Sequence, residues 1–102
     1  MQFLILAYDH KNGGLQRRLA VREQHLTLGN SMRAKGTCLM AVALLDRDQK
    51  MIGSAMIVDF PGRREVDDYL TIEPYVTNNV WDTVEIIPCK VGPTFTNNSS
   101  PC

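Results

Sequence analysis

Three basic side chains follow one side of a segment rich in helix-forming residues. Arg18, Arg22 and His25 are four and three positions apart, so a helix of about 3.6 residues per turn places them on one face. They lie between two apolar stripes, which consist of Leu15, Leu19 and Leu26 and of Val21, Leu28 and Met32. Charged groups inside an apolar arc are unfavourable unless they are paired or line a cavity. One interpretation of the spacing is therefore a site in which the three side chains line a cavity or are paired.

The same three residues also have a structural interpretation. Arginines can extend their aliphatic stems over apolar surface while the charge stays in water, and His25 can be a hydrogen-bonded structural residue. The other histidine, His10, falls in a segment expected to be an exposed loop, where a titratable side chain needs no explanation. Of the two histidines, His25 is therefore the candidate acid or base.

Carboxylates stand where predicted elements end, at Asp9 after the first strand and at Glu73 before the last. A histidine paired with a carboxylate is an oriented acid or base with a pKa near neutral, suited to moving protons next to a carbonyl. We expect His25 to pair with one of the two. The predicted topology favours Glu73 as this partner. Both predicted helices end at the same edge of the sheet, so they approach each other there. Alternatively, either carboxylate caps a helix or holds a turn.

Composition and motifs exclude several other classes of protein. Eleven Lys and Arg balance eleven Asp and Glu, which argues against a nucleic-acid partner. No apolar run approaches the ~20 residues of a membrane span, and no basic region precedes the first apolar run, so we expect a cytoplasmic protein. Phosphate-binding, dinucleotide-binding, HExxH and GxSxG motifs are absent. Three cysteines without CxxC spacing favour neither disulfides nor a zinc site; Cys38 and Cys89 are expected in apolar strands.

The elements that must position these residues follow from apolar patterning and from turn residues. The expected strands are residues 2–8, 37–45, 52–60 and 80–90, and the expected helices are 15–35 and 63–71, with a further helical turn up to Asn79. Gly36 ends the first helix as a C-cap glycine does, and Pro61-Gly62 ends the third strand. The chain length allows one domain, residues 1–90, followed by a loose tail, residues 91–102, that includes Cys102.

The β-α-β-β-α-β order predicts an α+β, ferredoxin-like fold with a four-stranded antiparallel sheet and both helices on one face. The other face of the sheet would then be uncovered. Consecutive apolar residues in the first strand, Leu4, Ile5 and Leu6, indicate that both faces need burial. A second copy of the chain can supply that burial, so the sequence predicts a homodimer packed sheet against sheet.

The segment Arg17-Arg18-Leu19-Ala20-Val21-Arg22-Glu23-Gln24-His25-Leu26 resembles the R-L-x-x-R-x-x-H-L helix of the YciI-like (YCII-related) family. Other segments are similar to landmarks of that family in the same order, over about residues 2–90. They are Leu6-Ala7-Tyr8-Asp9, Gly53-Ser54, Glu73-Pro74-Tyr75-Val76 and Val84-Glu85-Ile86-Ile87-Pro88. The resemblance implies a dimeric α+β barrel, related to muconolactone isomerase, with a site built on a histidine and an aspartate.

The family pattern assigns roles to particular residues of this chain. Its histidine corresponds to His25, its Asp-Pro-Tyr aspartate to Glu73 and the aspartate that ends its first strand to Asp9. The enzymatic role associated with the family is dehydrochlorination of a chlorinated hydroxyhydroquinone, which requires no metal or organic cofactor. For such a reaction His25 would be the general base, and the substrate-binding residues would be Arg18, Arg22, Ser54 and Tyr75.

The chain departs from the family pattern at two places that shape any pocket. Ala41-Val42-Ala43 stands where the family usually has Ala-Gly-Pro, and Cys89 replaces the aromatic residue after the last proline. Three interpretations of function follow. The first is a lyase, or a muconolactone-type isomerase, that acts on a small oxygenated ring without a cofactor. The second is a non-catalytic dimer that binds a small anion, and the third is an accessory subunit with surface arginines.

Overall fold

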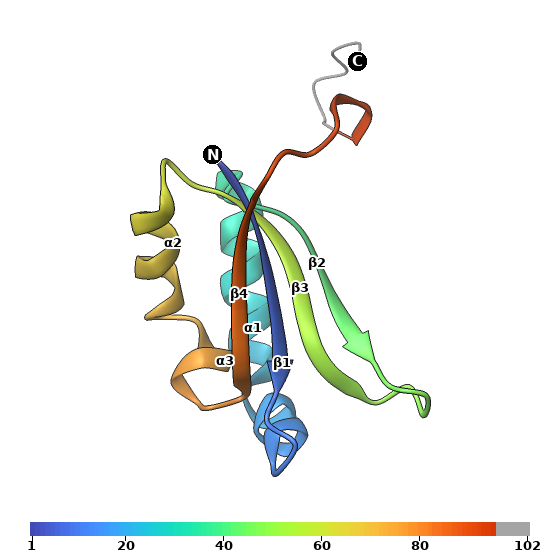
Figure 1. Cartoon of the computed structure of the whole chain (residues 1–102). Coiled ribbons are helices and arrows are strands. Elements are labelled where there is room, and N and C mark those ends of the chain that lie inside the picture. The colour runs from blue at the N-terminus through green and yellow to red at the C-terminus, as the bar shows by residue number, and fades with distance from the viewer. Residues whose placement is uncertain (96–102) are drawn as a thin grey trace.

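The computed structural model describes residues 1–95. Its elements are β1 (Gln2–Asp9), α1 (Gly14–Lys35), β2 (Cys38–Leu45), β3 (Met51–Asp59), α2 (Arg63–Leu70), α3 (Pro74–Thr77), β4 (Trp81–Cys89) and the short 3-10 helix η1 (Pro93–Phe95) (Figure 1). The expected β-α-β-β-α-β order is confirmed, with α3 as the additional helical turn. Of the expected tail, residues 96–102 with Cys102 lie outside the described residues.

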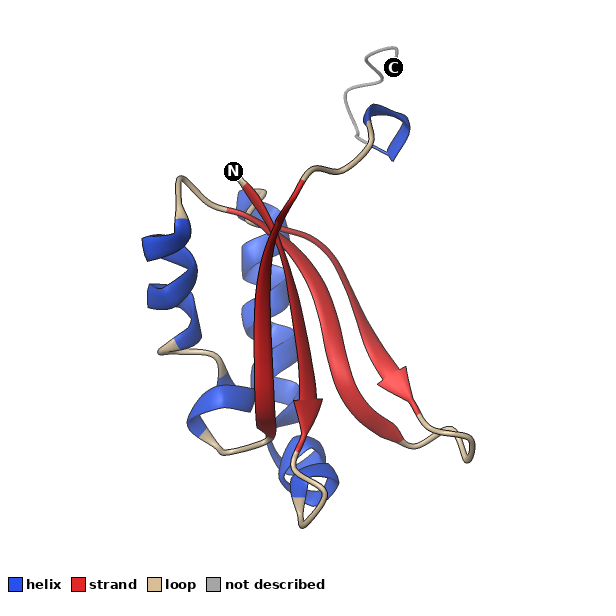
Figure 2. Cartoon of the chain, in the orientation of Figure 1, coloured by secondary structure: helices blue, strands red, loops and turns tan. Residues whose placement is uncertain are grey.

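The four strands form one antiparallel sheet in the order β2-β3-β1-β4 (Figure 2). β1 and β3 are the central strands, and Ile5 lies opposite Met56 on β3 and Ile86 on β4. The strands β1 and β2, which α1 connects, are not neighbours in the sheet. Strand β3 lies between them and pairs with both, and it forms a hairpin with β2. This order is the ferredoxin-like arrangement that the sequence predicts.

The buried core lies between the sheet and the helices. On β1 the residues Phe3, Ile5 and Ala7 are buried, and they lie opposite Val58, Met56 and Ser54 of β3, which are buried too. The helical part of the chain contributes Met32, Val66, Tyr69 and Tyr75 to the same core. Side chains alternate across a strand, so Leu4 and Leu6 lie on the opposite, uncovered face of the sheet.

Helix α1 starts and ends at glycines with left-handed backbone. Gly13 has φ 82° and Gly36 has φ 77°, and the Gly36 amide donates to the Arg33 carbonyl at 3.0 Å. The apolar stripe with Val21, Leu28 and Met32 packs on the core. The other apolar stripe, Leu15, Leu19 and Leu26, is not part of this core in the protomer. Leu19 is 55% and Leu26 43% exposed.

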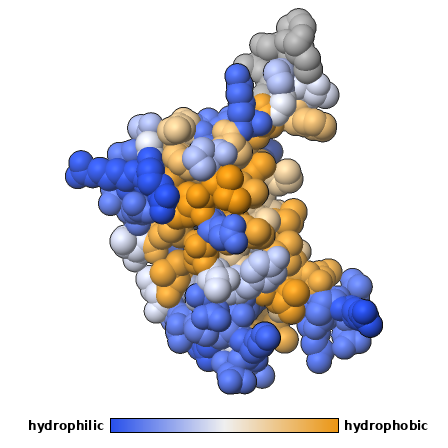
Figure 3. All heavy atoms as spheres, in the orientation of Figure 1, coloured by the Kyte–Doolittle hydropathy of each residue, from blue (hydrophilic) through white to orange (hydrophobic). Residues whose placement is uncertain are grey.

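The face of the sheet that no helix covers is rich in apolar residues. In Figure 1 the strands cross in front of α1, and Figure 3, in the same orientation, shows a broad apolar area over them. Exposed members of this face are Tyr8, Met40, Val42 and Ile87. Within residues 1–95, no helix is both long and apolar enough to cross a bilayer.

Candidate active site

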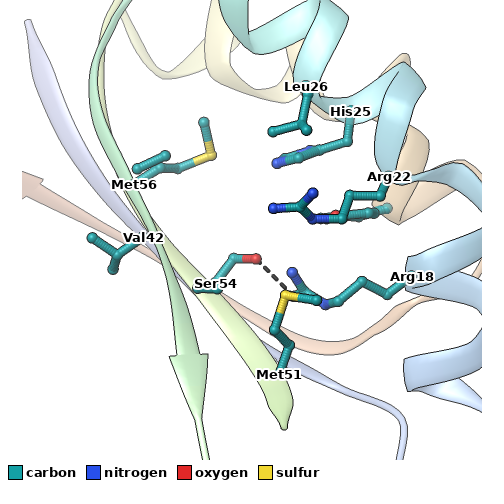
Figure 4. Close-up of a pocket in the computed structure, with 11 residues that line it drawn as sticks. Arg18, Arg22, His25, Leu26, Val42, Met51, Ser54 and Met56 are labelled. Carbon is teal, nitrogen blue, oxygen red and sulfur yellow. Dashed lines mark hydrogen bonds between the residues drawn. The ribbon is translucent and has the colours of Figure 1, made fainter. Parts of the chain in front are cut away.

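A cavity of about 170 Å³ lies between α1 and the β2–β3 hairpin (Figure 4). It is lined by Arg18, Arg22, His25, Leu26, Ala41, Val42, Ala43, Met51, Ser54, Met56 and Tyr75. Five of the seven residues predicted for the site therefore line one cavity. The two predicted carboxylates stand behind this lining, each against one of the basic residues of α1.

Glu73 is the carboxylate that pairs with His25. Its Oε1 contacts His25 Nδ1 in a short hydrogen bond, and the carboxylate is buried, with 1% of the residue exposed. Glu73 is also the N-cap of α3: Oε1 accepts the Tyr75 amide at 3.3 Å, and Pro74 occupies the first helical position. The capping interpretation and the pairing interpretation of this carboxylate thus both hold, and the cap fixes the carboxylate that orients the imidazole.

The orientation of His25 is set by two neighbours. Glu73 contacts Nδ1, and the Tyr75 ring stacks on the imidazole at 3.9 Å between centroids with 13° between planes. When the carboxylate accepts the Nδ1 proton, Nε2 carries the lone pair that can take a proton from a ligand. Figure 4 shows the His25 ring directed from α1 toward the β3 side of the cavity. The arrangement can perform general base chemistry at that nitrogen.

Asp9 does not contact His25; its partner is Arg18. The Arg18 guanidinium donates from Nε to Asp9 Oδ2 at 2.7 Å and from Nη2 to Asp9 Oδ1 at 2.9 Å, a two-point contact. Arg18 Nη2 also donates to Ser54 Oγ at 2.7 Å, and the guanidinium carbon lies 4.4 Å from the Tyr75 ring centroid. Asp9, expected as a possible partner of the imidazole, therefore holds an arginine that is only 2% exposed.

Arg22 lies at the mouth of the same cavity. It is exposed in the protomer, although its place between two apolar stripes of the helix would suggest burial. The reason is that the flanking residues Leu19 and Leu26 are themselves exposed along this side of α1. With no hydrogen bond to another described residue, the Arg22 guanidinium keeps its donors for a ligand.

Ser54 and Tyr75 complete the polar lining. Both are buried, and the Ser54 hydroxyl accepts from Arg18, which leaves its proton for donation into the cavity. Burial raises the pKa of the Tyr75 hydroxyl, while the positive charges of Arg18 and Arg22 act in the opposite direction. The Tyr75 ring also stacks on His25 and meets Trp81 edge-on, so it supports the site as well as lining it.

One polar residue of this site and several apolar ones are not apparent from the sequence. The Tyr69 hydroxyl donates to Glu73 Oε2 in a short hydrogen bond inside the core. Its spacing of four residues before Glu73 is the only signal in the sequence, and the end of α2 at Leu70 obscures it. Met51 and Met56 line the cavity from β3, and their strand pattern does not distinguish lining from core.

Comparison with known proteins agrees with the resemblance in the helix motif. Residues 1–90 match the YCII-related domain. An uncharacterized protein of Haemophilus influenzae is 33% identical over 96 residues, which span 88% of this chain and 97% of that protein. The solved structure of 5-chloro-2-hydroxyhydroquinone dehydrochlorinase (TftG) from Burkholderia phenoliruptrix AC1100, in complex with 2,5-dihydroxybenzoquinone, has a TM-score of 0.80. It is 22% identical, and the match covers 92% of this chain and 98% of that chain. The chain belongs to the YCII-related family.

Proposed function

We propose that the protein is a cofactor-independent lyase for a small oxygenated ring, and that it eliminates HCl from a chlorinated hydroxyhydroquinone. The observation that carries the proposal is the His25–Glu73 pair at the wall of a cavity that two guanidinium groups and a serine also line. A ring with several hydroxyl groups needs both a base and fixed donors to ionise. The structural neighbour with dehydrochlorinase activity supports the choice of reaction class.

The size and polarity of the cavity agree with a single-ring ligand. Its volume of about 170 Å³ is well below the roughly 300–1,000 Å³ of sites for larger ligands. Met56 and Leu26 offer apolar contacts to a ring face, while Arg22 and Ser54 offer donors to ring oxygens. Arg18, held by Asp9, contributes a fixed positive charge that favours an ionised oxygen nearby.

The reaction proceeds by proton transfers and loss of chloride. His25 Nε2 takes a proton from a ring hydroxyl, and the phenolate ketonises as the carbon that bears chlorine gains a proton. A second hydroxyl then loses its proton, the carbon–chlorine bond breaks, and chloride leaves with the bonding pair. The ring becomes a hydroxyquinone, one proton and one chloride are released, and no external oxidant is needed. Arg22 and Arg18 stabilise the oxyanion, and Tyr75 and Ser54 contact the ring or its oxygens.

The test is turnover of 5-chloro-2-hydroxyhydroquinone by the protein, followed by chloride release and by the ultraviolet spectrum of the quinone. If Nε2 of His25 is the general base, His25→Gln should lower the rate about 10²–10⁴-fold. Glutamine keeps the size and polarity of the side chain, so the variant should still fold. Glu73→Gln should lower the rate less, because an orienting carboxylate does not take the substrate proton itself.

Two comparisons decide between this proposal and its rivals. Asp9→Asn should lower stability more than it changes the rate per folded molecule, since Asp9 pairs with Arg18 rather than with His25. Muconolactone-type compounds are assayed in parallel for isomerisation. Binding of the hydroquinone without chloride release indicates a small-anion-binding module. Turnover by His25→Gln within a few-fold of the parent shows that His25 is structural and contradicts the proposal.

A further inference from the structure

The Tyr69 hydroxyl occupies the end of a buried chain of hydrogen bonds that leads to the cavity. It donates to Glu73 Oε2, and the other oxygen of the same carboxylate, Oε1, contacts His25 Nδ1 and accepts the Tyr75 amide. Tyr69 is 5% exposed and lies outside the cavity lining, so it cannot meet a ligand there. Among the groups that it contacts, Glu73 is the one that links it to the imidazole of His25.

A carboxylate buried this deeply depends on donors for its charge. Glu73 is 1% exposed, and its two oxygens receive three donors from three different helices: Tyr69 on α2, the Tyr75 amide of α3 and His25 on α1. Hydrogen bonds to a charged group are the strong ones, and the loss of one leaves a buried charge under-compensated. The phenol therefore does more than fill space in the core.

The surroundings of Tyr69 fix where its proton points. Its ring packs against Phe60 at 6.1 Å between centroids, which holds the ring plane. The other acceptor near the hydroxyl is the thioether of Met56 at 3.5 Å, a weak acceptor beside a carboxylate. Burial, followed by the charge of Glu73, raises the pKa of Tyr69, so the hydroxyl keeps its proton and remains a donor.

We propose that Tyr69 is a positioning residue for the proposed general base. It anchors Oε2 of Glu73 so that Oε1 is held on Nδ1 of His25, and it stabilises the state in which His25 is neutral and Glu73 is charged. That state is the one in which Nε2 can accept a proton. The inference rests on the proposed function, but the titration of His25 that it predicts can be measured without any substrate.

Removal of the hydroxyl should shift this titration in a definite direction. The state with a neutral imidazole carries a net negative charge on the pair, so it loses more from a missing donor than the protonated state does. Tyr69→Phe should therefore favour the protonated imidazole over the neutral one, relative to the parent. The other titratable or charged groups facing the pair are Arg18 and Arg22 from α1, Tyr75 from α3 and Cys38 from β2, and all are unchanged in the variant.

The experiment compares Tyr69→Phe with the parent by NMR titration of the His25 imidazole and by the pH–rate profile. Phe keeps the ring and its packing on Phe60, so the variant is expected to fold. His10 is the internal control: it lies at Asn79 and Asp82 and its titration should not move. With chlorohydroxyhydroquinone, kcat should fall about tenfold with KM within twofold, and the acidic limb should move to higher pH.

The Glu73→Gln background makes the test specific. If Tyr69 acts through the carboxylate, Tyr69→Phe has little further effect on kcat or on the His25 titration in that background. An unchanged His25 titration in Tyr69→Phe, or an equal loss in both backgrounds, overturns the positioning role. If the parent shows no turnover of the hydroquinone, the proposed function fails, and the titration still decides whether Tyr69 sets the state of His25.

Discussion

The two arginines of α1 perform different tasks although they are one helical turn apart. Arg18 is buried, and Asp9 and Ser54 receive its Nε and Nη2 hydrogens. Arg22 is exposed at the mouth of the cavity, and no hydrogen bond joins it to the rest of residues 1–95. At the scale of single residues, therefore, one guanidinium belongs to the architecture of the site and the other is available to a ligand.

This difference predicts opposite effects of two matched substitutions. Arg18→Ala leaves the buried Asp9 carboxylate without its partner, so the free energy of unfolding should fall by about 3–5 kcal/mol. Arg22→Ala should change it by less than about 1 kcal/mol, because the side chain is exposed. Urea unfolding of the two variants measures both effects.

The activity of the same variants separates binding from folding. Arg22→Ala should raise KM for the hydroquinone about tenfold, since it removes a charge-assisted donor. A large loss of stability in Arg22→Ala, with normal KM per folded molecule, would reverse the assignment of the two arginines.

At the scale of elements, the site depends on the close approach of β1 and β3. An added Cβ at Gly53 would lie 2.4 Å from the Ala7 carbonyl oxygen and 3.1 Å from Leu44 Cδ1. The Ala7 oxygen belongs to the backbone of β1, so it cannot move away from an added Cβ as the end of a flexible side chain could. Ser54, the next residue, holds the Arg18 guanidinium, so the spacing of these strands also places a polar group of the cavity.

Two glycine-to-alanine substitutions test this spacing. Gly53→Ala should lower the free energy of unfolding by about 2 kcal/mol or more, through overpacking against the neighbouring strand. Gly29→Ala is the matched control in α1: a Cβ added at Gly29 would meet no atom within 4 Å, so this change should stabilise the protein by about 0.5–1 kcal/mol. Thermal unfolding compares the two. A neutral Gly53→Ala variant would show that the sheet can widen at this position without loss.

At the scale of the whole molecule, the protomer leaves one face of its sheet uncovered, and that face exposes apolar side chains to solvent. Apolar residues on all four strands face solvent there, among them Leu6, Met40, Ile57 and Ile87. Monomeric proteins rarely expose contiguous apolar patches of this kind. A second copy of the chain presents the same face, so the two can bury each other around a twofold axis.

We therefore expect a homodimer at micromolar concentration, measured by sedimentation as twice the 11.5 kDa of the chain. Ile87→Glu, on β4 of the uncovered face, should shift the equilibrium to monomer by placing a charge in the apolar contact. Ile72→Glu is the control, because Ile72 is 60% exposed between α2 and α3, away from the sheet face. A stable and soluble parent monomer would contradict the dimer.

The elements and their order could be predicted from the sequence, because the signals for them are local. Gly36 after a long proline-free segment ends α1 where the C-cap rule places it, and strand boundaries agree with the expected ones to within a residue or two. Helical spacing was also enough to gather Arg18, Arg22 and His25 on one side of α1, and the order of elements was enough to predict the ferredoxin-like sheet.

The pairing of groups, in contrast, depends on the tertiary fold. Glu73 is 48 residues from His25, and it reaches the imidazole because α3 begins against α1 with Glu73 as its cap. Asp9 is adjacent to the same helix in sequence, yet the turn at Gly13 directs α1 so that Arg18 meets it instead. The packing of separate elements also decides which of two equally apolar stripes is buried, and why Tyr69 touches Glu73. No periodicity in the chain encodes these contacts, since they depend on how the elements pack in three dimensions.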